Sequence, residues 1–299
     1  MHKTMIALST FVLALAAPPP AAAWGTAAHR YIMARAIERL PVELKPFFEH
    51  YRDELVVRVV DPDTWRNAGW DEDPNHYLNF GVKDFGPYPF TALPREYGAA
   101  IEKFGTATLK RYGLLPWREA EEFGNLRRAF EGFANDASFA SSDTVLFAAV
   151  AAHYIQDANQ PLHATNNYDG QLTDQRGVHA RFETALFERF EGKLTVNPGP
   201  VSPVSNPRDA AFDVLLASYQ LVDPLLRADK EASAGKDTYD DDYFDKFFAK
   251  VRPILEKRLA DSVTATAAII VGAWEQAGKP RLTISRTPTV QKVRPPKSQ

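Results

Sequence analysis

The chain has 299 residues, 45% of them apolar, and a formal net charge of −3 at pH 7. This length allows one large buried core, or at most two domains, and the charge does not mark the whole protein as a polyanion binder. Because the sequence contains no cysteine, disulfides and thiolate zinc sites are excluded. Any bound metal must therefore be held by histidine, carboxylate or backbone atoms.

Residues 1–23 have the pattern of a cleaved signal peptide. Lys3 supplies the positive start, an apolar run follows it, and three alanines at 21–23 give a small-residue cleavage site. The apolar run is shorter than the roughly 20 residues that a membrane span needs. We therefore expect a secreted or periplasmic protein that begins at Trp24 and keeps no transmembrane anchor after cleavage.

Helical periodicity dominates the rest of the chain. An apolar stripe predicts a first helix over 29–40, which Pro41 ends, and residues 42–60 predict one or two more. Glycine, proline and aromatic residues make 75–94 a predicted long surface loop. Apolar periodicity predicts the remaining helices over 95–112, 117–135, 144–157, 177–190, 209–230 and 240–277.

The predicted helix over 144–157 is apolar on nearly every side, so we expect it to lie buried at the centre of the fold. Ser142 and Asp143 stand just before this helix and are good N-cap residues. The sequence therefore predicts a capped central helix.

Prolines mark the expected interruptions in the C-terminal half. Four of them make 193–208 a predicted linker loop. Pro224 is expected to break the helix before 230, and Pro253 is expected to kink or divide the last helix, which Gly278 and Pro280 end.

No segment shows the alternation of a strand, and no internal repeat is visible. We therefore predict an all-α fold with a single multi-helix domain over 24–280. The tail 281–299 carries five basic residues and no acidic one, and we expect it to be disordered.

Two pairs of the form His-x-x-x-carboxylate carry the chemistry. His153 and Asp157 lie in one predicted helix, His179 and Glu183 lie in the next, and His163 stands between the pairs. Residues four apart share one face of a helix, so each pair can bind one ion. A single histidine on an apolar face is usually a hydrogen-bonded core residue. Two such pairs with a third histidine favour metal binding, because uncompensated buried carboxylates are costly.

Two further histidines lie upstream. His29 is five residues after Trp24, and His76 follows an acidic stretch that includes Asp61 and Asp63. His50, among aromatic residues of a predicted helix, is interpreted as an ordinary surface residue.

The segment His153-Tyr-Ile-Gln-Asp157-Ala-Asn-Gln-Pro-Leu-His163 resembles the H-x-x-x-D-x-x-x-P-L-H signature of the zinc-dependent phospholipase C/P1 nuclease superfamily. The pair His179 and Glu183, preceded by Gly-Val, is similar to the second H-x-x-x-E/D pair of that superfamily.

Upstream elements extend this resemblance. Trp24-Gly25 with His29 resembles the W-G-x-x-x-H opening of the superfamily. Asp63-Thr-Trp-Arg66, followed by His76-Tyr, resembles its D-x-x-R and H-[YF] elements. All the elements occur in family order over more than half of the chain.

The resemblance implies an all-α domain around three zinc ions per chain. The first ion would be bound by Asp63, His76, His153 and Asp157. The second would be bound by His163, His179 and Glu183. The third would be bound by His29, a second oxygen of Asp157, and the free amino group and carbonyl oxygen of Trp24. Asp61 is the alternative to Asp63, which is preferred because Arg66 then falls three residues later.

The activity that the resemblance implies is hydrolysis of phosphate diesters by metal-activated water, in which zinc acts as a Lewis acid. Asp63 and Arg66 are the expected catalytic residues, since the guanidinium of Arg66 can donate two hydrogen bonds to a phosphate. Arg66, Tyr77 and Asn79 are the expected substrate contacts. No stable protein partner is implied.

The substrate class stays open between two alternatives. Glu183, where the nucleases typically carry Asp, is phospholipase-like, whereas Arg66 and the short Trp24-to-His29 spacing are nuclease-like. Tyr77 either stacks on a base or packs in the core. A phospholipid is slightly favoured over single-stranded DNA or RNA. An alternative of another class is a non-catalytic secreted protein with a structural zinc core.

Overall fold

Residues 24–284, which a computed structural model of the protein describes, form helices joined by turns and irregular segments. No strand occurs in this range, where only Phe80 and Thr165 form an isolated bridge. The predicted all-α fold is therefore confirmed. The predicted signal peptide and residues 285–299 of the predicted tail lie outside the described range.

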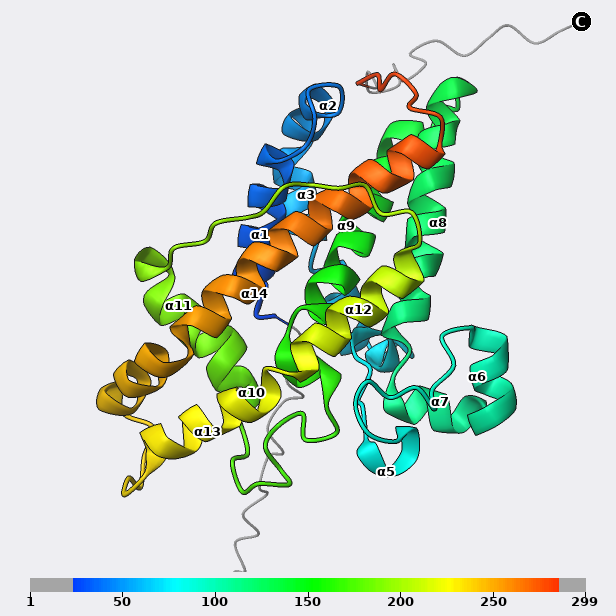
Figure 1. Ribbon diagram of the computed structural model, residues 1–299. Helices are drawn as coiled ribbons and strands as arrows, with labels where there is room; N and C mark the ends of the chain where they lie inside the picture. Colours follow the sequence, from blue (N-terminus) through cyan, green and yellow to red (C-terminus); the bar gives the residue numbers. More distant parts are fainter. Residues whose placement is uncertain (1–23, 285–299) are drawn as a thin grey trace, which may run out of the picture.

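The first half of the domain, down to the long helix α8, consists mostly of short helices (Figure 1). Their bounds are α1 (Thr26–Glu38), α2 (Lys45–His50), α3 (Arg52–Arg58), α4 (Asp61–Asn67), the 3-10 turn η1 (Asp73–His76), α5 (Val82–Phe85), α6 (Tyr97–Phe104), α7 (Thr106–Tyr112) and α8 (Leu115–Ala134).

The second half contains the central helix and the longest one. Their bounds are α9 (Ala140–Ala158), the 3-10 turn η2 (Pro161–Ala164), α10 (Val178–Ala180), the π-helical turn η3 (Arg181–Ala185), α11 (Leu186–Phe190), the 3-10 turn η4 (Glu191–Lys193), α12 (Pro207–Tyr219), α13 (Val222–Ser233) and α14 (Asp241–Gln276).

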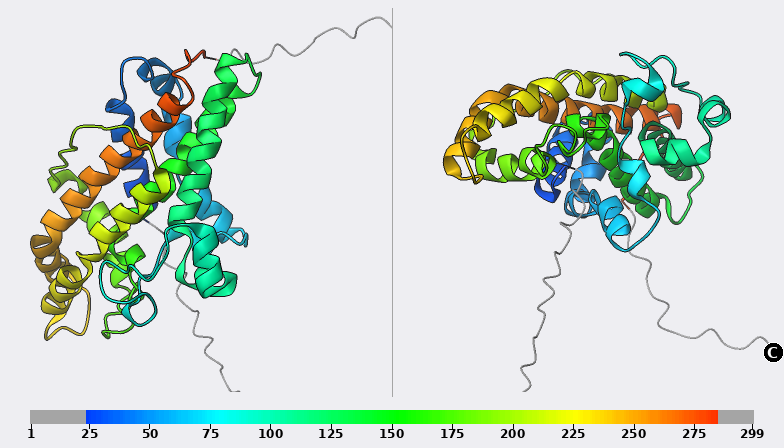
Figure 2. Two further views of the ribbon diagram at one scale, coloured as in Figure 1. Left: turned by 45° about the vertical axis from the view of Figure 1, so that its right-hand side comes forward. Right: turned by 90° about the horizontal axis from the view of Figure 1, so that it is seen from below.

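Helix α9 lies at the centre of the fold, as its apolar sequence predicts. It packs against α8, α14, α3 and α1, and its last eleven residues, Ala148–Ala158, are all buried. Small alanine side chains let the neighbouring helices approach it from several sides. The polar residues at its C-terminal end are thereby enclosed by other elements. Figure 2 shows α6 and α7 projecting from the far side of α8, away from α14.

The C-terminal helix α14 is one continuous helix that runs through Pro253. Proline removes one backbone hydrogen bond and costs about 3 kcal/mol in a helix interior. Here the buried side chains of Val251 and Leu255 hold the helix on both sides of the interruption. The segment 194–206 has no helix and crosses α14, as Figure 1 shows, so the predicted linker is confirmed.

The segment 75–94 was expected to be a surface loop, and this prediction is wrong for part of the segment. Its apolar side chains Leu78, Phe80 and Phe85 are buried, and it contains the short helix α5. The backbone N–H groups of Leu78 and Phe80 donate to the carbonyls of His163 (3.0 Å) and Ala164 (3.2 Å). Glycines and prolines diluted the apolar pattern, although the segment fills the space beside η2.

Three helix boundaries also differ from the predictions. The range 95–112 contains two helices, because Gly105 adopts a φ of 77° that favours glycine. Helix α9 begins before Ser142 and Asp143, so neither residue caps it, and Ser142 instead donates to the carbonyl of Phe139. The break near Pro224 falls earlier, at residues 220–221, and Pro224 lies in the first turn of α13, where its missing N–H is harmless.

None of the helices in the described range combines the length and the apolar content that crossing a bilayer requires. The exposed His50 lies on α2, as expected for a surface residue.

Candidate metal centre

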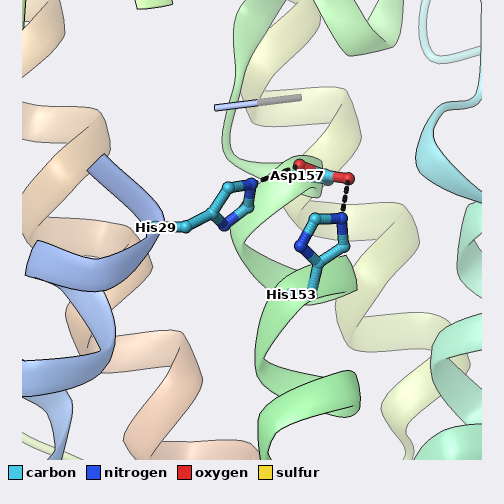
Figure 3. Close-up of side chains that lie close together, drawn as sticks. All are labelled: His29, His153 and Asp157. Atoms are coloured by element: carbon cyan, nitrogen blue, oxygen red, sulfur yellow. Dashed lines mark ion pairs between the residues drawn. The ribbon is translucent and has the colours of Figure 1, made fainter. Parts of the chain in front are cut away.

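The C-terminal turn of α9 presents two fully buried ligand-type side chains on one face. Nε2 of His153 lies 3.2 Å from Oδ2 of Asp157, which follows it by one helical turn. Figure 3 shows both side chains leaving α9 on the same side and meeting His29 from α1. The predicted spacing therefore produces the predicted juxtaposition.

Asp157 joins two groups of histidines through its two oxygens. Oδ1 lies 3.3 Å from Nε2 of His29, and Oδ2 lies 3.0 Å from Nδ1 of His76. The ring of His29 also stacks on that of His153, with centroids 4.3 Å apart. One group of potential ligands is thus formed by His29, His153 and Asp157 (Figure 3).

A second group of potential ligands lies on the other side of His153. It consists of Asp63 on α4, His76 at the end of η1, and His153 itself. Nδ1 of His76 lies 3.0 Å from Nε2 of His153 and 3.8 Å from Oδ1 of Asp63. Asp61 instead pairs with Arg58 at 3.3 Å and belongs to none of the groups.

The third group of potential ligands comes from η2 and the helical run 178–190. Nε2 of His179 lies 2.8 Å from Oε2 of Glu183 and 3.2 Å from Nε2 of His163. Nδ1 of His163 is 3.9 Å from Oδ1 of Asp157, so this group lies directly beside the other two. Glu183 lies within the π-helical turn, and π turns often occur at functional sites.

Four of the five histidines use Nδ1 for a hydrogen bond that points away from the cluster. The acceptors are Val59 O (2.8 Å, from His153), His76 O (2.7 Å, from His163), Tyr168 O (2.8 Å, from His179) and Gln156 Oε1 (2.6 Å, from His29). An oxygen acceptor beside Nδ1 places the hydrogen there and leaves a lone pair on Nε2. In each case Nε2 is the atom that faces the cluster.

The pKa values of Asp157 and His163 are shifted by burial and by the neighbouring groups of the cluster. Burial acts to raise the pKa of Asp157, but the neighbouring His153, through its charge and its hydrogen bond, holds that pKa well below its usual value. Burial, together with His179 and His76, lowers the pKa of His163 to about 3. His163 is therefore a neutral imidazole with a free lone pair.

His153 and His179, which each have a carboxylate one helical turn later, differ from His163 in the direction of their pKa shift. Burial acts against the charged form of His153 and His179, yet the carboxylates of Asp157 and Glu183 outweigh it and raise the pKa of both rings. Each pair attracts a cation. A metal ion that binds there must displace the proton that the ring would otherwise hold.

The donor set and its spacing fit zinc. Tetrahedral zinc with bonds of about 2.0–2.1 Å separates neighbouring ligand atoms by roughly 3.3–3.4 Å. The nitrogen pairs His76–His153 and His163–His179 are separated by 3.0 and 3.2 Å. Oδ1 of Asp157 and Oε1 of Glu183 are buried and make no hydrogen bond. Imidazole with carboxylate and no thiolate suits zinc among the common metals.

The start of the described chain lies against this cluster. Trp24 is fully buried, and its indole N–H donates to the carbonyl of Gln156 at 2.8 Å. A Cβ on Gly25 would lie 2.5 Å from Oγ1 of Thr184, so only glycine fits beside the turn that holds Glu183. The side chain of Trp24 is not a ligand, and the predicted ligands of Trp24 are its backbone atoms.

Two of the expected substrate contacts, Arg66 and Tyr77, belong to a chain of polar interactions beside Asp63. A guanidinium nitrogen of Arg66 lies 3.2 Å from Oδ1 of Asp63, and another lies 3.9 Å from Asp73. Tyr77 donates its hydroxyl hydrogen to Asp73 at 3.1 Å, and burial raises the pKa of that hydroxyl. Asn79 is buried, and its backbone N–H donates to the carbonyl of Tyr112 at 2.6 Å.

Two residues that contact the proposed ligands were not predicted. Gln156 contacts His29, and Gln160 donates to Oε2 of Glu183 at 2.9 Å. The two glutamines stand one residue before Asp157 and one before Pro161, inside the first histidine motif. A polar residue at such a position is the signal that could have identified them.

Comparison with protein-family models finds no family that matches this chain, and comparison with curated proteins finds no match either. The assignment of the site therefore rests on its geometry and on the motifs of the sequence.

Proposed function

We propose that this protein is a secreted zinc-dependent hydrolase of phosphate diesters, with three zinc ions per chain. The observation that supports the proposal best is the arrangement of the three ligand groups. Two of the groups share His153, and the two oxygens of Asp157 lie within 4 Å of histidines from all three groups, so the ions would lie side by side. A structural zinc site normally isolates one ion among four protein ligands, whereas adjacent ions are typical of phosphodiester chemistry.

Zinc bound at these groups would supply a hydroxide near neutral pH and a Lewis acid for the phosphate oxygens. The protein's own residues have separate tasks. Asp157 carries negative charge between the groups, and the outward hydrogen bonds of the histidines fix their rings. Arg66, whose side chain is mostly buried beside Asp63, would donate to a phosphate oxygen and neutralise the charge that develops there.

Membership of the phospholipase C/P1 nuclease superfamily is part of this proposal. It is supported by the match between the family ligand motifs and the three groups, which contain eight of the nine proposed ligand residues. The ninth is Trp24, whose amino group becomes a free amine only after cleavage of the signal peptide. The side chain of Trp24 is buried beside Gln156, next to the group that contains His29.

The substrate class that we favour slightly is a phospholipid. Tyr77 is anchored to Asp73 by its hydroxyl and half-buried, so much of its ring is already used in packing. Single-stranded DNA or RNA is the second candidate, because the remaining face of an aromatic ring beside Arg66 could stack on a base.

The proposal is tested with the purified mature protein. It is assayed with and without a chelator on a choline phospholipid, single-stranded DNA and RNA, and its zinc is counted by elemental analysis. We expect hydrolysis of at least one of these diesters that the chelator abolishes and added zinc restores. A zinc-loaded protein that cleaves none of them would instead support a structural zinc core.

A further inference from the structure

Three hydrogen bonds of Gln156 to other elements of the fold meet at the edge of the metal centre. Its side-chain oxygen lies 2.6 Å from Nδ1 of His29, and its side-chain nitrogen donates to Oγ1 of Thr266 on α14 at 3.3 Å. Its backbone carbonyl accepts the indole N–H of Trp24. The residue is fully buried, so water cannot replace any of these partners.

His29 differs from the other histidines that donate through Nδ1. His153, His163 and His179 donate to backbone carbonyls, which every sequence would offer. His29 donates to a side chain, so a single residue determines which ring nitrogen carries its hydrogen. The orientation of the Gln156 amide, with its nitrogen towards Thr266, presents the oxygen to His29.

Two consecutive residues of α9 therefore contact the two ring nitrogens of His29. Gln156 holds Nδ1, and Asp157 lies 3.3 Å from Nε2. With the hydrogen on Nδ1, the lone pair of Nε2 points to the place that the ring shares with Asp157 and His153 (Figure 3). With the hydrogen on Nε2, that nitrogen would donate to Asp157 and could bind no metal.

We propose that Gln156 is a positioning residue that selects the metal-binding tautomer of His29. It thereby controls the ion held by His29, His153 and Asp157, whereas the ion held by His163, His179 and Glu183 is independent of it. The inference rests on the proposed zinc binding and not on the nature of the substrate.

The test compares two substitutions of nearly equal size. Gln156→Leu removes the acceptor for Nδ1, and Gln156→Glu keeps an oxygen in the same place. We expect Gln156→Leu to bind one zinc ion about 10–100-fold more weakly than the parent, as is typical when an outer hydrogen-bond partner of a ligand is lost. Gln156→Glu should bind all its zinc with at least the affinity of the parent. Affinity is measured by competition with a coloured chelator, and zinc content by elemental analysis after dialysis.

A complementary variant identifies which ion is affected. Gln160→Leu removes the hydrogen bond to Glu183 in the other group. It should weaken one ion as well, and the double variant with Gln156→Leu should weaken two, because the two glutamines act on separate ligand groups. Weakening of the same single ion in all three variants would overturn the assignment to His29.

The tautomer is also measured directly, so the inference does not depend on the folding of any variant. Nitrogen-15 shifts of the histidine rings in the zinc-loaded parent should show His29 with its hydrogen on Nδ1 and zinc on Nε2. A hydrogen on Nε2 overturns the proposal. So does an unchanged zinc affinity in Gln156→Leu, or an equal loss in Gln156→Glu. A parent that binds no zinc at all would overturn the metal centre itself.

Discussion

Two buried polar clusters lie on opposite faces of the helical run 178–190, and they differ in how their charges are balanced. In the first cluster, Arg181 donates to Oδ1 of Asp229 from two nitrogens, at 2.9 and 3.2 Å. Tyr243 also donates to Asp229, and Gln175 donates to its other oxygen at 2.7 Å. One cation meets one anion, and each donor has an acceptor.

The second cluster is the candidate metal centre, where the hydrogen-bond acceptors outnumber the donors. We call it the open cluster. Five histidines turn nitrogens toward one another and toward the three carboxylates of Asp63, Asp157 and Glu183. Nε2 of His163 and Nε2 of His179, both potential ligand atoms, lie 3.2 Å apart. Both clusters are buried, so burial does not distinguish them. What distinguishes them is the excess of acceptors over donors in the second cluster. This excess predicts that only the second cluster binds cations.

Removal of metal is expected to change activity and stability more than any substitution does, and we expect the metal to leave only the open cluster. Chelation should remove about three zinc ions, abolish diester hydrolysis and lower the melting temperature. An ion at a thousand times its Kd contributes about 4 kcal/mol to the folded state. The shift is measured by calorimetry with and without chelator. An unchanged melting temperature in a protein shown to contain no transition metal would contradict the proposed difference between the clusters.

Matched substitutions of one aspartate in each cluster sharpen the comparison. Asp157→Asn should lose more than one zinc ion and all activity, because an amide is a poor bridging ligand. Asp229→Asn leaves Arg181 buried without its counter-ion, which costs about 3–5 kcal/mol of stability. The zinc content of the folded Asp229→Asn protein should nevertheless equal that of the parent. Elemental analysis of both variants decides, and loss of zinc from Asp229→Asn would show that the two clusters are one unit.

Sequence patterns predicted the candidate metal centre because helix geometry sets the spacing of its proposed ligands, and because that spacing resembles known motifs. His153 and Asp157, like His179 and Glu183, lie four residues apart, and that spacing fixes their relation before the fold is known. Arg181 and Asp229 are 48 positions apart. No local rule connects them, and only the packing of α13 and α14 against the run 178–190 brings them together.

The same reasoning explains what was missed near the metal centre. The segment 75–94 was predicted to be exposed because its local composition resembles a loop, yet its backbone pairs with η2 and brings His76 beside His163. The role of Gln156 depends on the approach of α1 to α9, which is a tertiary contact. The spacing of residues along the sequence determines which of them share a helix face. The packing of elements that are distant in the sequence determines which residues that face contacts.

Arg66 lies at the edge of the open cluster and should affect turnover more than zinc content. Arg66→Ala should lower kcat on any phosphate diester by roughly 100-fold, as expected for the loss of one charge-stabilising donor. Zinc content is measured in parallel, since Arg66 also pairs with Asp63. A normal turnover in the variant would remove Arg66 from the catalytic residues.

Tyr77 separates the two substrate candidates. Tyr77→Ala should weaken nucleic-acid cleavage far more than lipid cleavage if the ring stacks on a base, at about 1–3 kcal/mol per base. Tyr77→Phe, which loses only the hydrogen bond to Asp73, is the matched control. Equal losses on both substrates in a folded Tyr77→Ala protein would make Tyr77 a packing residue.

Glu119 offers a smaller effect and a dependence on pH. This carboxyl is fully buried on α8 and makes no hydrogen bond, and burial together with Glu122 raises its pKa well above the ordinary value. A raised pKa in the folded state means that stability falls as pH rises through that value. Glu119→Gln should therefore raise the melting temperature by a few degrees at pH 7–8. Near pH 4, where the carboxyl is neutral in both states, the difference should vanish.

Scans of parent and variant at several pH values, all in chelator so that zinc release does not contribute, measure this difference. An advantage of the variant that is equal at pH 4 and pH 8 would show that folding does not raise the pKa of Glu119.

The smallest expected effect belongs to Asp61, which lies only two residues from the proposed ligand Asp63. Its carboxylate pairs with the half-exposed Arg58 and lies outside the three ligand groups. Exposed pairs of this kind contribute about 0–1 kcal/mol. Asp61→Asn should therefore keep its zinc and its activity, while Asp63→Asn loses both. This contrast depends on helix phase, because on α4 Asp63 and not Asp61 faces His76 and His153. If Asp61→Asn lost zinc and Asp63→Asn kept it, the register of the whole D-x-x-R element, and with it the assigned role of Arg66, would be wrong.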